Sequence, residues 1–181
     1  MRAGHVLAAL AERLPHDAVL VEETPSSRPE LHARIAATEP LGFVSAMGML
    51  GFALPAAIGL RMAQPDRPVL TVVGDGSSLY QIQAVWSAAR YGAGVLFIVL
   101  SNGGYAIMDR LAERNGGPGP WPRIDGVDVG AIARGFGCDA VRIETYAELL
   151  ERLDAALATL AARDAPLLLE VVVAPDETFD L

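Results

Sequence analysis

Two short segments of glycine and polar residues each follow an apolar, strand-like run of the sequence. The run from Val69 to Val73 ends at Gly74-Asp75-Gly76-Ser77, and the run from Val95 to Leu100 ends at Ser101-Asn102-Gly103-Gly104. The first segment offers an anionic carboxylate oxygen and the second a neutral amide oxygen. Magnesium prefers about six oxygen ligands and usually takes some of them from phosphate and water. Because glycine lets the backbone approach a ligand closely, the two segments indicate a site for a diphosphate clamped by a divalent metal ion.

A helix is expected between the two runs, because the residues from about Ser78 to Arg90 are amphipathic. A strand, a crossover helix and a second strand form a right-handed unit whose strands are parallel, so both polar segments reach the same edge of the sheet. Ligands of open α/β sheets bind at this carboxyl edge. The N–H groups of Gly76 and Ser77, at the start of the helix, are expected to be free to point at an anion.

The remaining patterns extend this unit into a doubly wound α/β fold. We expect a mostly parallel sheet of about five to six strands with helices on both faces, formed by residues 1–181 as a single domain. Further strands are expected at 18–21, 138–143 and 167–173. Helices are expected at 3–14, 30–37, 51–63, 105–113, 129–135 and about 146–162, the last two capped by Asp128 and Thr145, and residues 174–181 are expected to be frayed.

Composition excludes several classes of protein. The net charge is −8 with scattered Lys and Arg, which argues against a nucleic-acid partner. Cys138 is the only cysteine, so no intrachain disulfide can form, and we expect it to be a small core residue of a protein in a reducing compartment. No apolar run approaches the roughly 20 residues that span a bilayer. We therefore expect a cytoplasmic protein without a membrane partner.

A family resemblance rests on these motifs. Gly74-Asp75-Gly76 followed 26 positions later by Asn102 resembles the GDG…N fingerprint of thiamine diphosphate enzymes. The block from Gly51 to Gly59, the helix 84–89 and Asn102-Gly103-Gly104-Tyr105 resemble benzoylformate decarboxylase and its acetolactate synthase relatives. The likeness covers nearly the whole chain. It identifies the chain as similar to the C-terminal, diphosphate-binding domain of a thiamine diphosphate-dependent 2-oxo acid decarboxylase or carboligase.

The resemblance implies a role for each residue of the candidate site. Magnesium would be held by Asp75, Asn102 and the backbone carbonyl of Gly104, although relatives often have a second asparagine at the position of Ser101. Cofactor-binding residues would be Gly74, Gly76, Ser77 and Tyr105, together with Gly48, Leu50, Ser26 and Ser27. The loop of Ser26 and Ser27 could equally be an ordinary turn in which Ser27 caps a helix.

Two of these residues would act at the reacting end of the cofactor. By resemblance, Gly48 supplies a carbonyl to the aminopyrimidine, and Leu50 is the apolar wedge that bends the cofactor into a V shape. Ile107 and Leu111 would face the side chain of the substrate, and Ile107 points to a short or aliphatic 2-oxo acid.

The chain lacks one part that the resemblance requires. The glutamate that protonates the cofactor ring belongs to a separate pyrimidine-binding domain, so the chain alone should bind thiamine diphosphate and Mg²⁺ weakly and catalyse little. The chain is either a fragment of a longer enzyme or a natural subunit of a split enzyme, as in sulfopyruvate decarboxylase. Self-association into a homo-oligomer is expected, because the family builds each site between two chains.

Two other functions remain as alternatives. A nicotinamide-binding domain would need G-x-G-x-x-G after the first strand, and here Asp75 would repel phosphate unless a metal were present. A non-catalytic module could retain the fold and self-associate without binding a cofactor.

Several other conspicuous side chains are given structural interpretations. Glu22 and Glu23 are expected at a solvated edge, and Trp86 is expected to pack beside Ile82 and Val85. The loop 115–123, rich in glycine and proline, is either a lid over the site or a static surface loop. The three histidines, His5, His16 and His32, are expected to be solvated.

Overall fold

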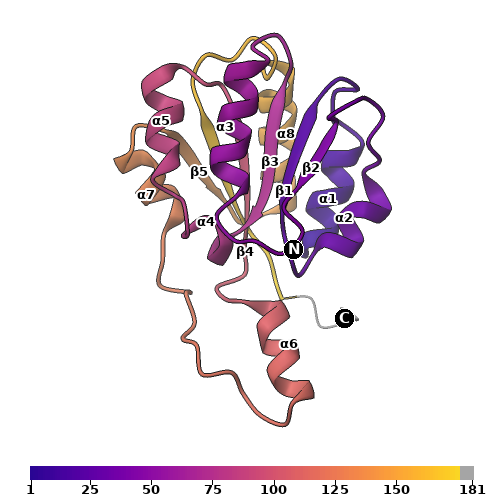
Figure 1. Cartoon of the computed structure of the whole chain (residues 1–181), viewed down its shortest axis with the longest axis vertical. Helices are drawn as coiled ribbons and strands as arrows, with labels where there is room; N and C mark the ends of the chain where they lie inside the picture. Colours follow the sequence, from indigo (N-terminus) through magenta and orange to yellow (C-terminus); the bar gives the residue numbers. More distant parts are fainter. Residues whose placement is uncertain (176–181) are drawn as a thin grey trace.

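The computed structural model describes residues 1–175, which form one six-stranded sheet. Its strands are β1 (Val19–Glu23), β2 (Phe43–Ser45), β3 (Val69–Gly74), β4 (Leu96–Ser101), β5 (Asp139–Ile143) and β6 (Leu167–Val172). They lie in the order β2-β1-β3-β4-β6-β5, and every pairing is parallel. The expected doubly wound α/β fold is confirmed (Figure 1).

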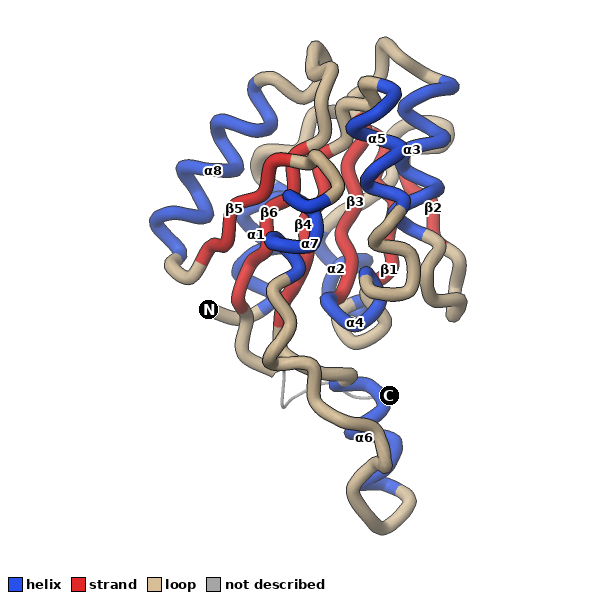
Figure 2. Tube along the Cα trace, turned by 90° about the vertical axis from the view of Figure 1, so that its left-hand side faces the viewer, coloured by secondary structure: helices blue, strands red, loops and turns tan. Residues whose placement is uncertain are grey.

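Helices cover both faces of the sheet (Figure 1), and Figure 2, turned by 90°, shows the strands of the sheet side by side. One face carries α1 (Ala3–Ala11), α2 (Arg28–Arg34) and α8 (Tyr146–Ala158), and the other carries α3 (Ala53–Ala63), α5 (Ala84–Tyr91) and α7 (Val129–Gly135). The short helix α4 (Asp75–Ser78) follows β3 directly, and α6 (Ala106–Arg114) projects beyond the carboxyl edge of the sheet (Figure 1). None of the helices in the described part is long and apolar enough to cross a membrane.

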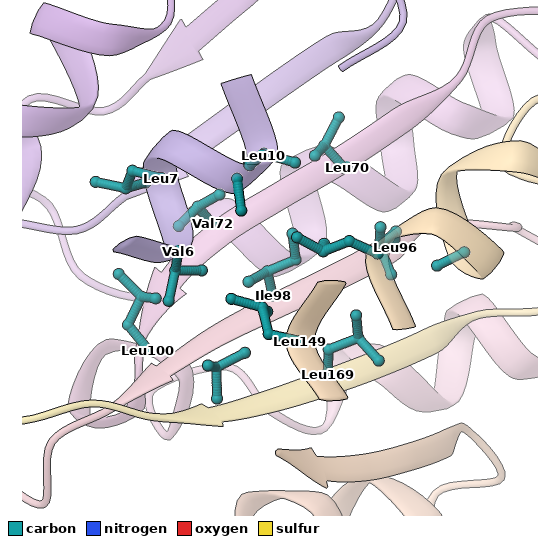
Figure 3. Close-up of a cluster of buried hydrophobic side chains, with 14 of the residues drawn as sticks. Val6, Leu7, Leu10, Leu70, Val72, Leu96, Ile98, Leu100, Leu149 and Leu169 are labelled. Carbon is teal, nitrogen blue, oxygen red and sulfur yellow. The ribbon is translucent and has the colours of Figure 1, made fainter. Parts of the chain in front are cut away.

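The central strands are buried on both faces, which explains their nearly continuous apolar sequences. Alternate residues of a strand point to opposite sides. In β4, Leu96 and Ile98 contact the core beneath α1 and α8, whereas Phe97 and Val99 contact the core beneath α3 and α5. Figure 3 shows the core beneath α1 and α8, which includes Leu10 of α1 and the strand residues Leu70 and Ile98.

The order of the strands places a crevice between β1 and β3. From β1 the chain continues outward to β2, and from β3 it continues in the opposite direction to β4. The loops that leave β1 and β3 therefore diverge at the carboxyl edge. A reversal of this kind is the usual position of a ligand site in open α/β sheets.

Two elements differ from the expectation by more than the positions of their ends. The strand β2 was not expected, because three half-buried residues at the edge of a sheet are too few to show an alternating pattern. The expected helix from Ser78 to Arg90 is broken into α4 and α5. Between them the backbone forms tight bonds three residues apart, such as Tyr80 N–H to Ser77 O and Gln81 N–H to Ser78 O.

Other local expectations can be compared directly. Asp128 and Thr145 cap α7 and α8 as expected, because their side chains accept the N–H groups of Ala131 and Glu148. Trp86 is half exposed and packs edge-on against Tyr91, so the expectation that it packs beside the buried Ile82 and Val85 is wrong. The histidines are exposed, as expected. Of the expected frayed tail, residues 176–181 lie outside the described residues.

Candidate functional site

The carboxylate of Asp75 lies at the end of β3 and joins it to the loop after β4. Its Oδ2 accepts the backbone N–H of Gly103 at 2.7 Å, and its Oδ1 accepts the N–H of Gly76 at 2.8 Å. The residue is only 4% exposed. Burial raises the pKa of Asp75 above its ordinary value, although these backbone N–H groups oppose the shift, and the charge of Glu170 adds to it.

The loop after β4 presents the predicted amide beside this carboxylate. Asn102 uses its side-chain Oδ1 to accept the N–H of Gly104 at 3.0 Å. Gly103 has a φ of +73°, a backbone conformation that residues with a side chain rarely adopt, so glycine is required where this loop turns. The guanidinium of Arg123 donates to the backbone carbonyl of Asn102 at 3.2 Å, which attaches the long loop after α6 to the same turn.

Gly76 allows an aromatic ring to close over α4. A Cβ atom at this position would lie 2.5 Å from Cε1 of Tyr105, so only glycine accommodates the ring. The N–H of Gly76 donates to Asp75, so the expectation that it is free to point at an anion is wrong for this structure. With four residues, α4 is also too short to develop a full helix dipole.

A cavity of about 300 Å³ opens at the crevice between β1 and β3. Every residue predicted for the site lines it: Ser26, Ser27, Gly48, Leu50, Gly74, Asp75, Gly76, Ser77, Asn102, Gly104, Tyr105, Ile107 and Leu111. The structure thus brings together residues that are up to 85 positions apart in the chain. Their individual roles stay predictions.

The cavity also contains residues that sequence reasoning missed. Thr24, Arg28, Met108 and Val173 are among its lining. Arg28 and Thr24 belong to the polar turn after β1, whose position at a carboxyl edge was a usable signal. Val173 gave no signal, because its apolar strand sequence is typical of any buried strand.

The loop after β1 is held by buried carboxylates, so the expectation of a solvated edge at Glu22 and Glu23 is wrong. The side chain of Glu22 is fully buried and accepts hydrogen bonds from Ser45 Oγ at 2.6 Å and Arg28 Nε at 3.0 Å. Burial alone would raise the pKa of Glu22, but the bonds from Ser45, Thr24 and Arg28 outweigh it and lower the pKa.

Ser26 and Ser27 differ in their surroundings. Ser26 Oγ accepts the N–H of Ile107 at 3.0 Å, which joins this turn to the start of α6. Ser27 occupies the N-cap position of α2, which agrees with the interpretation of an ordinary turn that precedes a helix. Its side chain, however, makes no capping hydrogen bond. Both residues face the cavity.

Glu23 binds the segment that leads into α3. Its Oε1 accepts the N–H of Gly51, and its Oε2 accepts those of Phe52 and Ala53, each at 2.7 Å. Gly48 and Leu50 lie just before these residues and line the cavity.

The chemistry of the donor set fits a hard cation. Asp75 forms no ion pair with any cationic side chain within residues 1–175, although its carboxylate is buried. No cluster of three or more His, Cys, Asp or Glu side chains capable of holding a metal occurs among those residues. One carboxylate, one amide oxygen and one backbone carbonyl are instead compatible with magnesium, which takes its remaining ligands from phosphate and water.

Comparison with known proteins agrees with this geometry. Residues 27–171 match the family model described as thiamine pyrophosphate enzyme, C-terminal TPP binding domain. The chain belongs to this family. Thiamine pyrophosphate is the same compound as thiamine diphosphate, so the resemblance drawn from the GDG…N motif is confirmed.

Individual relatives of this thiamine pyrophosphate domain are similar over most of the chain. Benzoylformate decarboxylase of Pseudomonas aeruginosa is 41% identical over 177 residues, which are 97% of this chain and 32% of the relative. Acetolactate synthase large subunit of Parasynechococcus marenigrum is 35% identical over 62% of this chain and 19% of its own length. The structure of thiamine diphosphate-dependent 4-hydroxybenzoylformate decarboxylase of Rhodococcus jostii superposes with a TM-score of 0.91 at 33% identity, covering 98% of this chain and 33% of that one. The chain thus spans about a third of the length of these decarboxylases.

Proposed function

We propose that the chain binds thiamine diphosphate through a magnesium ion held by Asp75, Asn102 and the carbonyl of Gly104. Gly76 and Ser77 would contact the diphosphate, with Gly74, Tyr105, Ser26 and Ser27 around it. The observation that carries the proposal is the buried Asp75 carboxylate, which lies at the cavity and has no cationic partner within residues 1–175. A divalent cation would supply the missing positive charge.

The remaining residues of the cavity would serve the other end of the cofactor. Gly48 and Leu50 would contact its ring system, and Ile107 and Leu111 would contact the substrate. When bound, thiamine diphosphate supplies the nucleophilic carbon that attacks a 2-oxo acid, whereas the protein orients it and excludes water. The apolar side chains that Leu50, Ile107 and Leu111 contribute to the cavity support this assignment, because an apolar surface suits a site from which water is excluded during the reaction.

We further propose that the chain acts as the C-terminal domain or subunit of a cytoplasmic 2-oxo acid decarboxylase or carboligase. A pyrimidine-binding domain or subunit would complete the site, in a homo-oligomer. The support is that the chain covers only about a third of its decarboxylase relatives. On this proposal the chain alone is catalytically inactive.

The test is calorimetric titration of the chain with thiamine diphosphate in magnesium and then in excess chelator. Binding that requires magnesium is the expected result. Binding that is equally strong in chelator would contradict the metal assignment. If neither titration shows binding, the experiment is repeated with a pyrimidine-binding partner; continued absence of binding would favour the non-catalytic, self-associating module.

A further inference from the structure

The segment Ser45–Phe52 is tied at both of its ends to consecutive residues of β1. At the first end, Ser45 Oγ donates to Glu22 at 2.6 Å. At the other end, the backbone N–H groups of Gly51 and Phe52 donate to Glu23, each at 2.7 Å. Two buried carboxylates that are neighbours in the sequence therefore determine where this segment runs.

The middle of the segment is not held by packing of its own side chains. Met47 and Met49 are 70% and 63% exposed. Met47 and Gly48 have φ values of +52° and +133°, which places a non-glycine residue in a conformation that L-residues rarely adopt. A strained, exposed stretch keeps its shape only if its surroundings impose it. The anchors at its two ends are the groups that can do so.

Of the two anchors, Glu23 accepts more hydrogen bonds from this part of the chain than Glu22 does. A single carboxylate accepts three N–H groups, from Gly51, Phe52 and Ala53, at the point where α3 begins. A negative charge is favoured there by the dipole of an eleven-residue helix. The residue is 1% exposed and belongs to β1, which is paired on both sides. The sheet thus fixes the carboxylate, and the carboxylate fixes the chain just after Leu50.

We propose that Glu23 is a positioning residue that sets Gly48 and Leu50 at the cavity through the three backbone N–H groups that it accepts. Glu23 is not a ligand of the cofactor. The inference rests on the proposed function, because it assigns Gly48 and Leu50 to the ring end of thiamine diphosphate. It separates the site into a diphosphate end, built on β3, β4 and the turn of Ser26 and Ser27, and a ring end whose placement depends on the Glu23 side chain.

This separation gives a test with two ligands. Thiamine diphosphate reaches both ends, whereas inorganic pyrophosphate with magnesium reaches only the diphosphate end. We expect Glu23→Gln to weaken thiamine diphosphate binding about tenfold, as the loss of charge-assisted hydrogen bonds should, and Glu23→Ala to weaken it further. Pyrophosphate affinity, measured by the same calorimetry, should change less than about twofold. Glu12→Gln, at an exposed glutamate that follows the end of α1, is the matched control and should change neither affinity.

Hydrogen exchange measured by mass spectrometry provides an arm that needs no ligand. In Glu23→Gln the amides of residues 48–53 should exchange faster than in the original chain, while those of β3 should not change. Faster exchange that is confined to this segment supports the proposal, and unchanged exchange overturns it.

The binding outcomes are equally decisive. Equal weakening of both ligands indicates a general structural role and overturns the proposal, as does unchanged affinity for thiamine diphosphate. If the original chain binds no thiamine diphosphate either alone or with a pyrimidine-binding partner, the proposed function is what fails. Hydrogen exchange then decides whether Glu23 positions the segment.

Discussion

The Asp75 carboxylate accepts the backbone N–H of Gly103 at 2.7 Å, and this single bond joins the ends of β3 and β4. The two strands are adjacent and parallel, with Gly74 paired to Leu100, so the segments that follow them leave the same edge. Asp75 is therefore part of the candidate metal site, and its side chain also holds the backbone of the loop that places Asn102 beside it. Changes at Asp75 should affect the site in a way that depends on metal and on pH.

Replacing Asp75 with alanine should abolish magnesium-dependent binding of thiamine diphosphate. The change removes the only anionic ligand of the proposed metal set, so the cation no longer bridges protein and diphosphate. Calorimetric titration in magnesium measures the effect. Asp66→Ala, at an exposed turn, is the matched control and should bind like the original chain. Unaltered affinity in Asp75→Ala would remove Asp75 from the metal site.

Magnesium affinity should rise with pH through the raised pKa of Asp75. Burial holds this pKa above the ordinary value of 3.8, and a metal ligand must be ionised to bind. Protonation therefore competes with magnesium at acidic pH, and the competition disappears once the pH exceeds the raised pKa. Titrations over a pH series measure the dependence. An affinity that is constant across the acidic range would contradict it.

Glu22→Gln should destabilise the fold at neutral pH by about 2–3 kcal/mol, because it replaces a buried carboxylate that accepts charge-assisted hydrogen bonds. The folded-state pKa of Glu22 is lower than its ordinary value of 4.5. Its stabilising contribution is therefore fully present above pH 4.5 and is lost as the pH falls through the lower folded-state value.

Urea unfolding of both proteins over a pH series checks this expectation. The difference in unfolding free energy should shrink as the solution becomes more acidic. A difference that stays constant down to low pH would show that the charge of Glu22 is not what matters.

Gly76→Ala should lower the free energy of unfolding by about 1–3 kcal/mol, the usual range for overpacking. Its Cβ would lie 2.5 Å from the ring of Tyr105, so the ring must move away from α4. Gly59→Ala is the matched control, since nothing lies within 4 Å of its Cβ and alanine favours a helix by up to about 1 kcal/mol. Denaturant unfolding of both variants is the measurement. Equal effects at the two positions would contradict the contact.

The thiol of Cys138 should be unreactive in the folded chain. It is 1% exposed, and burial together with the nearby Asp139 raises its pKa to about 12. A thiol reagent at pH 8 should therefore label the cysteine only in denaturant. Rapid labelling of the folded chain would show that the segment around Cys138, just before β5, opens readily.

The sequence by itself determined the strands that carry the site and the residues at their ends. Runs such as Val69–Val73 indicate buried strands because most of their residues are apolar and β-branched, which is a local property. The direction of the crossover then follows from chirality, so the sequence alone predicts Asp75 and Asn102 at the same edge of the sheet. The cavity lined by both residues agrees with that placement.

Only the tertiary structure decided what surrounds these residues. The hydrogen bonds that satisfy the buried Glu22 and Glu23 include donors 23 to 30 positions away, among them Ser45 and Ala53, and no local pattern reports such partners. The sequence does not predict β2 for a similar reason: a three-residue edge strand exists only through its pairing with β1. A strand can be predicted from the residues that form it. The surroundings of a charged side chain depend instead on residues distant in the sequence, which only the packed tertiary structure brings to it.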